Sequence, residues 1–192
     1  MPTSRSSQLL TAMRGRQFVR FERPYEESSV HGYVVDLGPK FFLLALVSDR
    51  IWFDGFECFR IEDVRNFRAD PYAEFAESAL KMRGERLPRK PRVSVAGIEE
   101  LLLSAARAFP LVTIHREKVD PGVCWIGQVL GVEGGRMLLL EITPAAKWRT
   151  EPTSFRLSEI TRVSLGGDYE AALHLVGGEP GLASETARRT KL

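Results

Sequence analysis

The chain offers few residues whose types and spacing could carry out catalysis. Its three histidines, His31, His115 and His174, show no metal-ligand spacing, whereas a zinc site needs at least three ligands held together. Glu62 and Asp63 are adjacent carboxylates, but acids at the end of a short strand usually face water. No serine or cysteine stands in a nucleophile elbow. The sequence therefore predicts a protein that is not an enzyme and that binds neither a metal nor a cofactor.

The glycine pair and the two cysteines have structural explanations as well. Gly134-Gly135 fits the turn of a hairpin better than a phosphate-binding loop, which would follow a strand and open a helix. Cys58 and Cys124, the only cysteines, are expected to be small residues in strands of a cytosolic protein.

Two groups of residues could contact nucleic acid. The first is aromatic and could stack on bases; it comprises Phe41, Phe42, Trp52, Phe53, Phe56 and Phe59. The second is basic and could follow a phosphate backbone; it comprises Arg83, Arg86, Arg89, Lys90 and Arg92. For the aromatic group, packing in the core is the favoured alternative, because the second copy keeps an aromatic residue at the positions of Trp52 and Phe59. For the basic group, a solvated linker is favoured, because Glu85 interrupts it and no aromatic residue lies within it. The net charge of +2 indicates no strongly charged partner.

The elements that would position these residues come as two copies of one pattern. The stretch from Trp52 to Arg68 returns in altered form from Trp148 to Ser164. The residues taken as equivalent are Trp52 and Trp148, Phe59 and Phe155, Gly32 and Gly127, and Tyr72 and Tyr169. Their separation grows slightly along the chain, and each step falls in a loop or turn. The sequence thus predicts an internal repeat, with Trp52 and Trp148 as equivalent buried or half-buried residues.

Each copy is predicted to contain a helix, five short strands and a second helix. In the first copy a helix capped by Ser6 or Ser7 precedes strands at 17–23, 30–37, 41–47, 56–61 and 64–68 and a helix at 72–82. In the second copy a helix at 98–108 precedes strands at 111–116, 125–132, 137–142, 154–157 and 161–165 and a helix at 169–176. Asp54-Gly55 is expected to be a turn, and the glycine inside each second strand permits a sharp bend.

The predicted fold class is mainly β with flanking helices, arranged as two tandem five-stranded barrels. The predicted domains are a first small barrel at 1–84, a linker at 85–96, a second small barrel at 97–178 and a disordered tail at 179–192. The prolines and charges of the linker are expected to keep it out of any core.

This arrangement resembles the Sm-like members of the SH3-type small β-barrels. Gly32, Val34 and Asp36 look like the first Sm signature, and the second copy has Gly127 and Val129. The asparagine that this family uses against a base is missing from both copies, and so is its arginine-glycine pair. The chain is also similar to small uncharacterised bacterial proteins in three short segments, Asp54-Gly55-Phe56, Phe59-Arg60 and Asp63-Val64. This resemblance implies a bacterial source and no assigned activity.

The function predicted from these features is that of a non-catalytic intracellular binding or scaffold protein that contacts a protein partner or itself. The alternative is RNA or single-stranded nucleic-acid binding through the basic linker, and a third option is a small-molecule sensor with its ligand between the barrels. No apolar run reaches the length of a membrane span, and residues 1–16 do not form a signal peptide. The expected location is the cytoplasm.

The central strands, aligned 96 positions apart as 41–46 and 137–142, make one further prediction. Both faces of the first are apolar, whereas the second carries Glu141 on one face. A buried unpaired glutamate would be costly. We therefore expect Phe41 and Leu43 to be buried within the chain and Glu141 to stay partly exposed.

Overall fold

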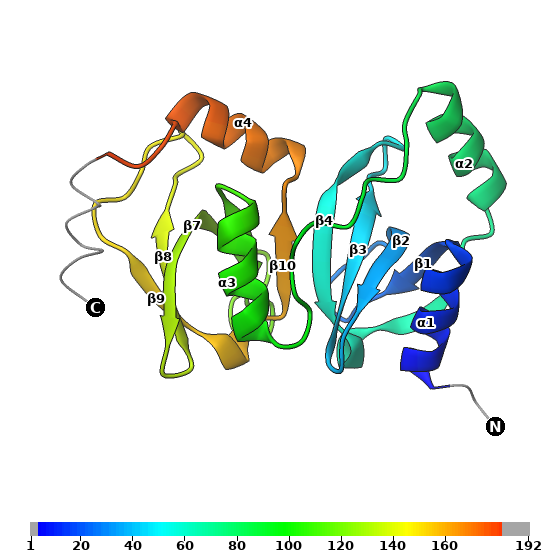
Figure 1. Cartoon of the computed structure of the whole chain (residues 1–192), viewed down its shortest axis with the longest axis horizontal. Coiled ribbons are helices and arrows are strands. Elements are labelled where there is room, and N and C mark those ends of the chain that lie inside the picture. Colours follow the sequence, from blue (N-terminus) through cyan, green and yellow to red (C-terminus); the bar gives the residue numbers. More distant parts are fainter. Residues whose placement is uncertain (1–3, 182–192) are drawn as a thin grey trace. The chain divides into compact units, whose positions relative to one another are not determined.

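The structure, a computed structural model, describes residues 4–181 (Figure 1). These residues form a mainly β protein with four α-helices, ten strands and two short 3-10 helices, which confirms the predicted mainly β class with helices. They divide into two compact units: the first runs to Pro91 and includes Val95–Gly97, and the second consists of Arg92–Ser94 and the chain from Ile98 onward. Of the tail predicted to be disordered, residues 182–192 lie outside the described residues.

The two units contain the same series of elements. The first unit has α1 (Arg5–Gly15), β1 (Phe18–Glu22), β2 (Val30–Leu37), β3 (Phe41–Val47), β4 (Phe53–Arg60), a 3-10 helix (Ile61–Asp63), β5 (Arg65–Ala69) and α2 (Ala73–Met82). The second unit has α3 (Ile98–Ala108), β6 (Val112–His115), β7 (Cys124–Glu133), β8 (Arg136–Glu141), β9 (Thr153–Arg156), a 3-10 helix (Leu157–Glu159), β10 (Arg162–Leu165) and α4 (Asp168–Gly177).

The strands follow the same antiparallel order in both units. In the first unit the order is β5-β1-β2-β3-β4, and in the second it is β10-β6-β7-β8-β9. Each second strand also carries a register shift at the same place, between Val34 and Asp36 in β2 and between Val129 and Gly131 in β7. Within the described residues no ladder joins β4 to β5 or β9 to β10, so neither unit is closed by hydrogen bonds into the predicted barrel.

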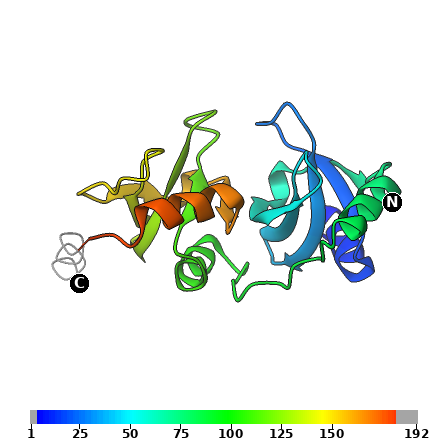
Figure 2. The ribbon, with the colours of Figure 1, turned by 90° about the horizontal axis from the view of Figure 1, so that it is seen from above.

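The first helix of each unit packs on the strands of its own unit. Helix α1 lies beside β2, and α3 lies beside β7 (Figures 1 and 2). The side chain of Ser4, rather than that of Ser6 or Ser7, caps α1 by accepting a hydrogen bond from Ser7 N at 3.2 Å. The cap residue must precede the first helical turn, and that turn begins at Arg5, earlier than the apolar spacing indicated.

The core of the first unit lies between α1 and the inner faces of its strands. Phe21 is its centre, with its ring 5.5 Å from that of Phe42 and 5.3 Å from that of Phe59, both edge-on. The remaining buried members of this cluster are Leu9, Ala12, Val19, Val30, Val34, Leu44, Ile61 and Val64. Phe41 and Leu43 on the other face of β3 are buried too, and Glu141 is partly exposed. The prediction for these three residues is confirmed.

The glycines inside the second strands allow two backbones to approach closely. A Cβ on Gly32 would lie 2.2 Å from the carbonyl oxygen of Ala45, and one on Gly127 would lie 2.1 Å from that of Leu140. Gly32 pairs with Val19 of β1, as Gly127 pairs with Val112 of β6. Any larger residue at either place would force the neighbouring strand away.

The central strands are aligned one residue differently from the prediction. Gly32 faces Leu46 and Gly127 faces Glu141, so these strands are 95 positions apart, and the alignment by 96 is wrong. Phe59 and Phe155 nevertheless face the corresponding residues Phe42 and Met137. The extra residue of the second unit therefore falls after β8, in the segment that leads into β9, where no apolar pattern marks it.

Trp52 and Trp148 are not counterparts. Trp148 pairs with Ile142, as Phe53 pairs with Val47. In the preceding loop Ser48 N donates to Trp52 O, and Thr143 N donates in the same way to Lys147 O, so the counterpart of Trp52 is Lys147. Trp52 is 42% exposed and Trp148 is half-buried. The predicted equivalence is wrong because two adjacent aromatic residues stand in the first unit, and the indole was matched instead of the strand position.

Three smaller predictions also need correction. Asp54-Gly55 is not a turn but lies inside β4, where Gly55 adopts a φ of 68°. The linker does contribute buried residues, namely Val93 and Val95, because its two valines alternate with polar residues as in an extended segment. Tyr72 caps α2 whereas Tyr169 lies in the first turn of α4, which Gly167 caps, so the two tyrosines occupy different helix positions.

An arginine packed on an aromatic ring recurs in both units. The guanidinium of Arg23 lies 4.8 Å from the ring centre of Phe59, and that of Arg116 lies 5.4 Å from the ring centre of Phe155. Each arginine also pairs with a glutamate at 2.9 Å, Glu26 in the first unit and Glu159 in the second. These contacts tie the end of the first strand to the fourth strand of the same unit.

Candidate ligand pocket

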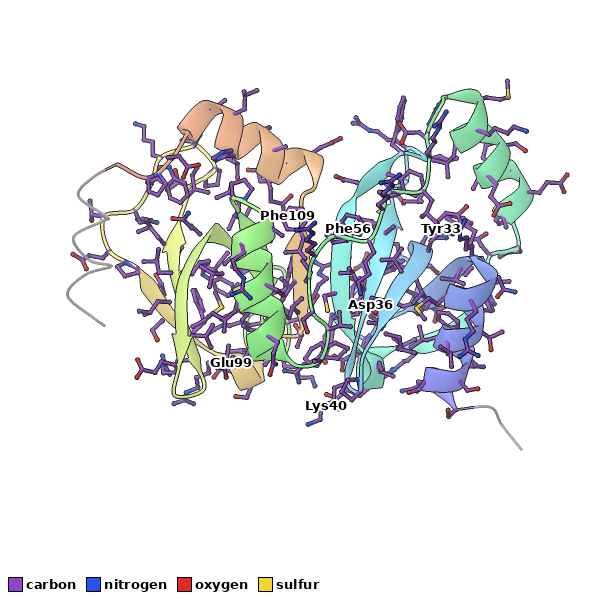
Figure 3. All side chains as sticks on the ribbon, in the orientation of Figure 1. Tyr33, Asp36, Lys40, Phe56, Glu99 and Phe109 are labelled. Atoms are coloured by element: carbon purple, nitrogen blue, oxygen red, sulfur yellow. The ribbon has the colours of Figure 1, made fainter. Side chains whose placement is uncertain are left out.

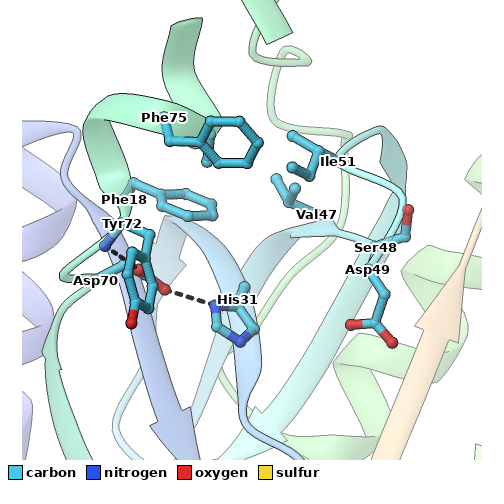
Figure 4. A pocket seen from close by; sticks show the side chains of 10 residues that line it. Phe18, His31, Val47, Ser48, Asp49, Ile51, Asp70, Tyr72 and Phe75 are labelled. Atoms are coloured by element: carbon cyan, nitrogen blue, oxygen red, sulfur yellow. Dashed lines mark hydrogen bonds and ion pairs between the residues drawn. The ribbon is translucent and has the colours of Figure 1, made fainter. Parts of the chain in front are cut away.

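A pocket of about 340 Å³ opens on the first unit (Figure 4). It lies where the start of β1, the start of β2, the loop between β3 and β4 and the start of α2 come together. Its lining residues are Phe18, His31, Val47, Ser48, Asp49, Ile51, Asp70, Tyr72, Phe75 and Ala76. Its volume is in the range of small-ligand pockets, and it has the same mixture of apolar walls with a few polar groups.

A histidine and a buried aspartate form a hydrogen-bonded pair in the pocket. His31 Nδ1 lies 2.6 Å from Asp70 Oδ2, and the Asp70 side chain is only 2% exposed. Asp70 Oδ1 accepts a second hydrogen bond from Tyr72 N at 2.7 Å. As a carboxylate Asp70 can only accept, so His31 Nδ1 is the donor of this hydrogen bond. No described residue bonds to Nε2.

Aromatic side chains make up much of the remaining wall. The Phe18 ring stacks on His31, with ring centres 6.3 Å apart. Tyr72 and Phe75, at the start of α2, are 69% and 65% exposed, although large apolar side chains are normally buried. These two rings form an exposed rim beside the pocket.

The loop between β3 and β4 is held in an unusual conformation. Ile51 has a φ of 59°, which is rare for a β-branched residue and costs about 1–3 kcal/mol. Arg83, just after α2, holds this loop by donating to the carbonyl oxygens of Arg50 and Ile51 at 2.5 and 2.8 Å. Its guanidinium also lies 4.7 Å from the ring centre of Trp52. Strained residues of this kind cluster at functional sites.

The hydroxyl group of Tyr33, next to the pocket, helps to hold α2 in place. The ring of Tyr33, on β2 (Figure 3), lies tilted against that of Phe18 with ring centres 5.3 Å apart, and its hydroxyl donates a hydrogen bond to Glu77 at 3.2 Å. Burial, with a smaller effect of the Glu77 charge, raises the pKa of Tyr33 above its ordinary value. The phenol therefore stays protonated and keeps donating to the helix.

An apolar cluster lies at the corresponding place in the second unit. The counterparts of Phe18, His31, Val47 and Ile51 are Leu111, Ile126, Ile142 and Ala146, as the strand pairing and loop hydrogen bonds show. These four residues belong to one apolar cluster with Leu173 of α4 and Trp148. The loop residue Ala146 repeats the left-handed conformation of Ile51, with a φ of 54°.

The two units differ in the side chains that the last helix and the fourth-strand region place at this site. On the side facing the strands α2 adds the small buried Ala76, whereas α4 adds the larger Leu173. Trp148 packs on the second cluster and donates from Nε1 to the carbonyl oxygens of Gly177 and Gly178 at 3.3 and 3.1 Å. The second unit therefore fills with its own side chains a place that the first unit leaves open.

Two of the five basic residues predicted to contact nucleic acid, Arg83 and Lys90, have partners within the first unit. Arg83 holds the loop at Ile51, and Lys90 Nζ pairs with Asp36 Oδ2 at 2.5 Å, where Asp36 lies on β2 (Figure 3). The remaining three, Arg86, Arg89 and Arg92, are exposed. None of the five lines the pocket.

The histidines and cysteines considered at the outset also lie apart. His31 lines the pocket of the first unit, and His115 and His174 lie in the second unit. Cys58 is buried and Cys124 is exposed, and burial raises the pKa of the Cys58 thiol. Within residues 4–181 no group of three or more His, Cys, Asp or Glu could hold a metal, and no described helix has the length and apolar character needed to cross a bilayer.

Sequence reasoning placed no site at the pocket. His31 and Asp70 are 39 positions apart, and His31 has an apolar counterpart in the second unit. The available signal was a difference between the copies at otherwise matched positions. No family model, no curated protein and no solved structure matches the chain.

Proposed function

We propose that this protein is a non-catalytic binding module whose first unit receives an apolar side chain of a protein partner in the pocket. The single observation that carries this proposal is the contrast with the second unit. There Leu173 and Trp148 pack on the counterparts of the pocket walls. The same place in the first unit is an open volume of about 340 Å³.

The exposed rim supports a macromolecular partner. Tyr72 and Phe75 stand beside the opening and are more than half exposed. Exposed aromatic groups next to a pocket are typical of protein-binding surfaces, in which a side chain of the partner enters the pocket and the rim excludes water. A pocket for an isolated metabolite would enclose most of its ligand.

The finer description of the fold belongs to the same proposal. We propose that each unit is an Sm-like, SH3-type small barrel, opened at one seam. Support comes from the shared strand order, from the 3-10 helix between the fourth and fifth strands, and from the close backbone approach at Gly32 and Gly127. A cytoplasmic location is supported by two cysteines that form no disulfide.

Selection from a random peptide library on the immobilised protein tests the proposed function. We expect the selected peptides to share one large apolar residue. Ala76→Leu places a larger side chain in the lining of the pocket and should abolish their binding. Ser78→Leu adds the same side chain at an exposed position of the same helix and should leave binding unchanged. Peptides that bind the Ala76→Leu protein as tightly as the unmodified protein would overturn the proposal.

A further inference from the structure

We infer that the group bound in this pocket carries a positive charge or a hydrogen-bond donor next to its apolar part, as in an apolar residue beside a lysine, an arginine or an amino terminus. The inference rests on the proposed function, since it specifies the chemistry of that same site. It follows from how the polar lining residues are distributed.

The pocket is two-sided. Phe18, Val47, Ile51 and Phe75 surround its apolar part, and Figure 4 shows Tyr72, His31 and Asp49 with their polar ends turned to one edge. The ligand therefore needs an apolar portion for one side and a polar portion for this edge.

The polar edge carries one exposed carboxylate. Asp49 is an exposed carboxylate with no ion pair to any described residue. Asp70 accepts a hydrogen bond from His31 Nδ1, and this pair lies on the same side of the pocket. Two aspartates line the pocket, and no lysine or arginine is among its lining residues. An anionic ligand would meet the exposed carboxylate of Asp49 with no lysine or arginine beside it, whereas a cationic donor would be matched.

The aromatic rings add to the same preference. The faces of Phe and Tyr rings attract cations within about 6 Å, and Phe18, Tyr72 and Phe75 all line the pocket. A cationic group at the edge can thus contact both a carboxylate and a ring. In the second unit the counterpart of His31 is the apolar Ile126, which offers no polar atom at this position.

Three small probes with one phenyl ring and different charges test this inference. Titrations of 2-phenylethylamine, 2-phenylethanol and 3-phenylpropionate into the full chain, followed by amide chemical shifts of the lining residues, should give the order cation, alcohol, anion. Asp49→Asn should reduce amine affinity about two- to fivefold and leave alcohol affinity unchanged. Glu74→Gln removes an exposed acid of α2 outside the lining and serves as the matched control.

The outcomes separate the inference from the proposed function. Equal affinity for all three probes, or no effect of Asp49→Asn on the amine, overturns the inference and leaves an apolar binding pocket. Failure of every probe to shift the lining residues, combined with peptides that bind the Ala76→Leu protein, counts against the pocket itself. Preference for the anion would also overturn the inference.

Discussion

The Nδ1 atom of His31 lies 2.6 Å from Oδ2 of Asp70, and this bond joins β2 to the segment that starts α2. The two residues are 39 positions apart. The aspartate is almost completely buried, and its other oxygen is bonded to Tyr72 N. The polar pair of the pocket is therefore also a structural link that sets where α2 begins.

Asp70→Ala should lower the free energy of unfolding by about 1–3 kcal/mol, because it leaves a backbone N–H and a histidine without their partner. Urea unfolding followed by circular dichroism measures the change. Asp49→Ala, at an exposed lining position, should change stability by less than about 0.5 kcal/mol. Equal effects of the two substitutions would show that the bond to His31 does not stabilise the first unit.

Gly32→Ala and Gly127→Ala should each destabilise the protein by about 1–3 kcal/mol, since the added Cβ would meet a carbonyl oxygen of the neighbouring strand. Gly131→Ala is the control: it lies in the same strand as Gly127, and its Cβ would have nothing within 4 Å. We expect that control to be neutral or slightly stabilising. A thermal midpoint unchanged in either test variant would argue against the close approach.

The two ring-packed arginines should differ in importance. The side chain of Arg23 is fully buried beside Glu26, whereas that of Arg116 is 18% exposed beside Glu159. Removing one partner of a buried pair costs about 3–5 kcal/mol, so Arg23→Met should be the more damaging change and Arg116→Met clearly milder. Chemical denaturation of both variants tests the order, and the reverse order would contradict the burial.

Trp148→Ala should cost more stability than Trp52→Ala. Trp148 is half-buried in the apolar cluster of the second unit and donates to two carbonyl oxygens. Trp52 is 42% exposed, and its ring lies 4.7 Å from the guanidinium of Arg83, an interaction worth about 0.5–1 kcal/mol at exposed sites. Differential scanning calorimetry should therefore show a larger loss of thermal stability for Trp148→Ala, and equal losses would contradict the different burial of the two indoles.

Nucleic-acid binding through the linker makes a separate prediction. If it occurs, replacing Arg86, Arg89 and Arg92 by serine should reduce the dependence of log affinity on log salt by roughly 2–3, one phosphate contact for each arginine. Lys90→Ser serves as the control, since Lys90 is paired with Asp36. A slope that does not change in the triple variant would exclude the linker as the contact surface.

The sequence predicted the elements well because their signals are local. The strands at Val30–Leu37 and Phe41–Val47 and the helix at Ile98–Ala108 have the predicted bounds, since alternating or helically spaced apolar residues end at polar turns. The residue-by-residue alignment of the two copies was harder to predict from the sequence. At Trp52 an indole was a stronger signal than strand position, and only the pairing of Trp148 with Ile142 corrected it.

The pocket was beyond local reasoning for a physical reason. Its walls come from β1, β2, a loop and α2, and none of these segments carries a recognisable motif. An open volume depends on a side chain that is too small, here Ala76, and a small residue on a helix has no distinctive pattern. The bond between His31 and Asp70 likewise depends on two segments that only the fold brings together.

The filled cluster of the second unit has a consequence for how such a chain can acquire a binding site. Ala76 in one helix and Leu173 in the other mean that one copy can keep its apolar surface satisfied internally while the other leaves that surface available. Open and sealed forms of one scaffold then differ by a few side chains. A partner that enters the open copy would complete its packing from outside and stabilise it by an amount that rises with the logarithm of the partner's concentration. The first unit would then gain on binding the packing that the second has by itself.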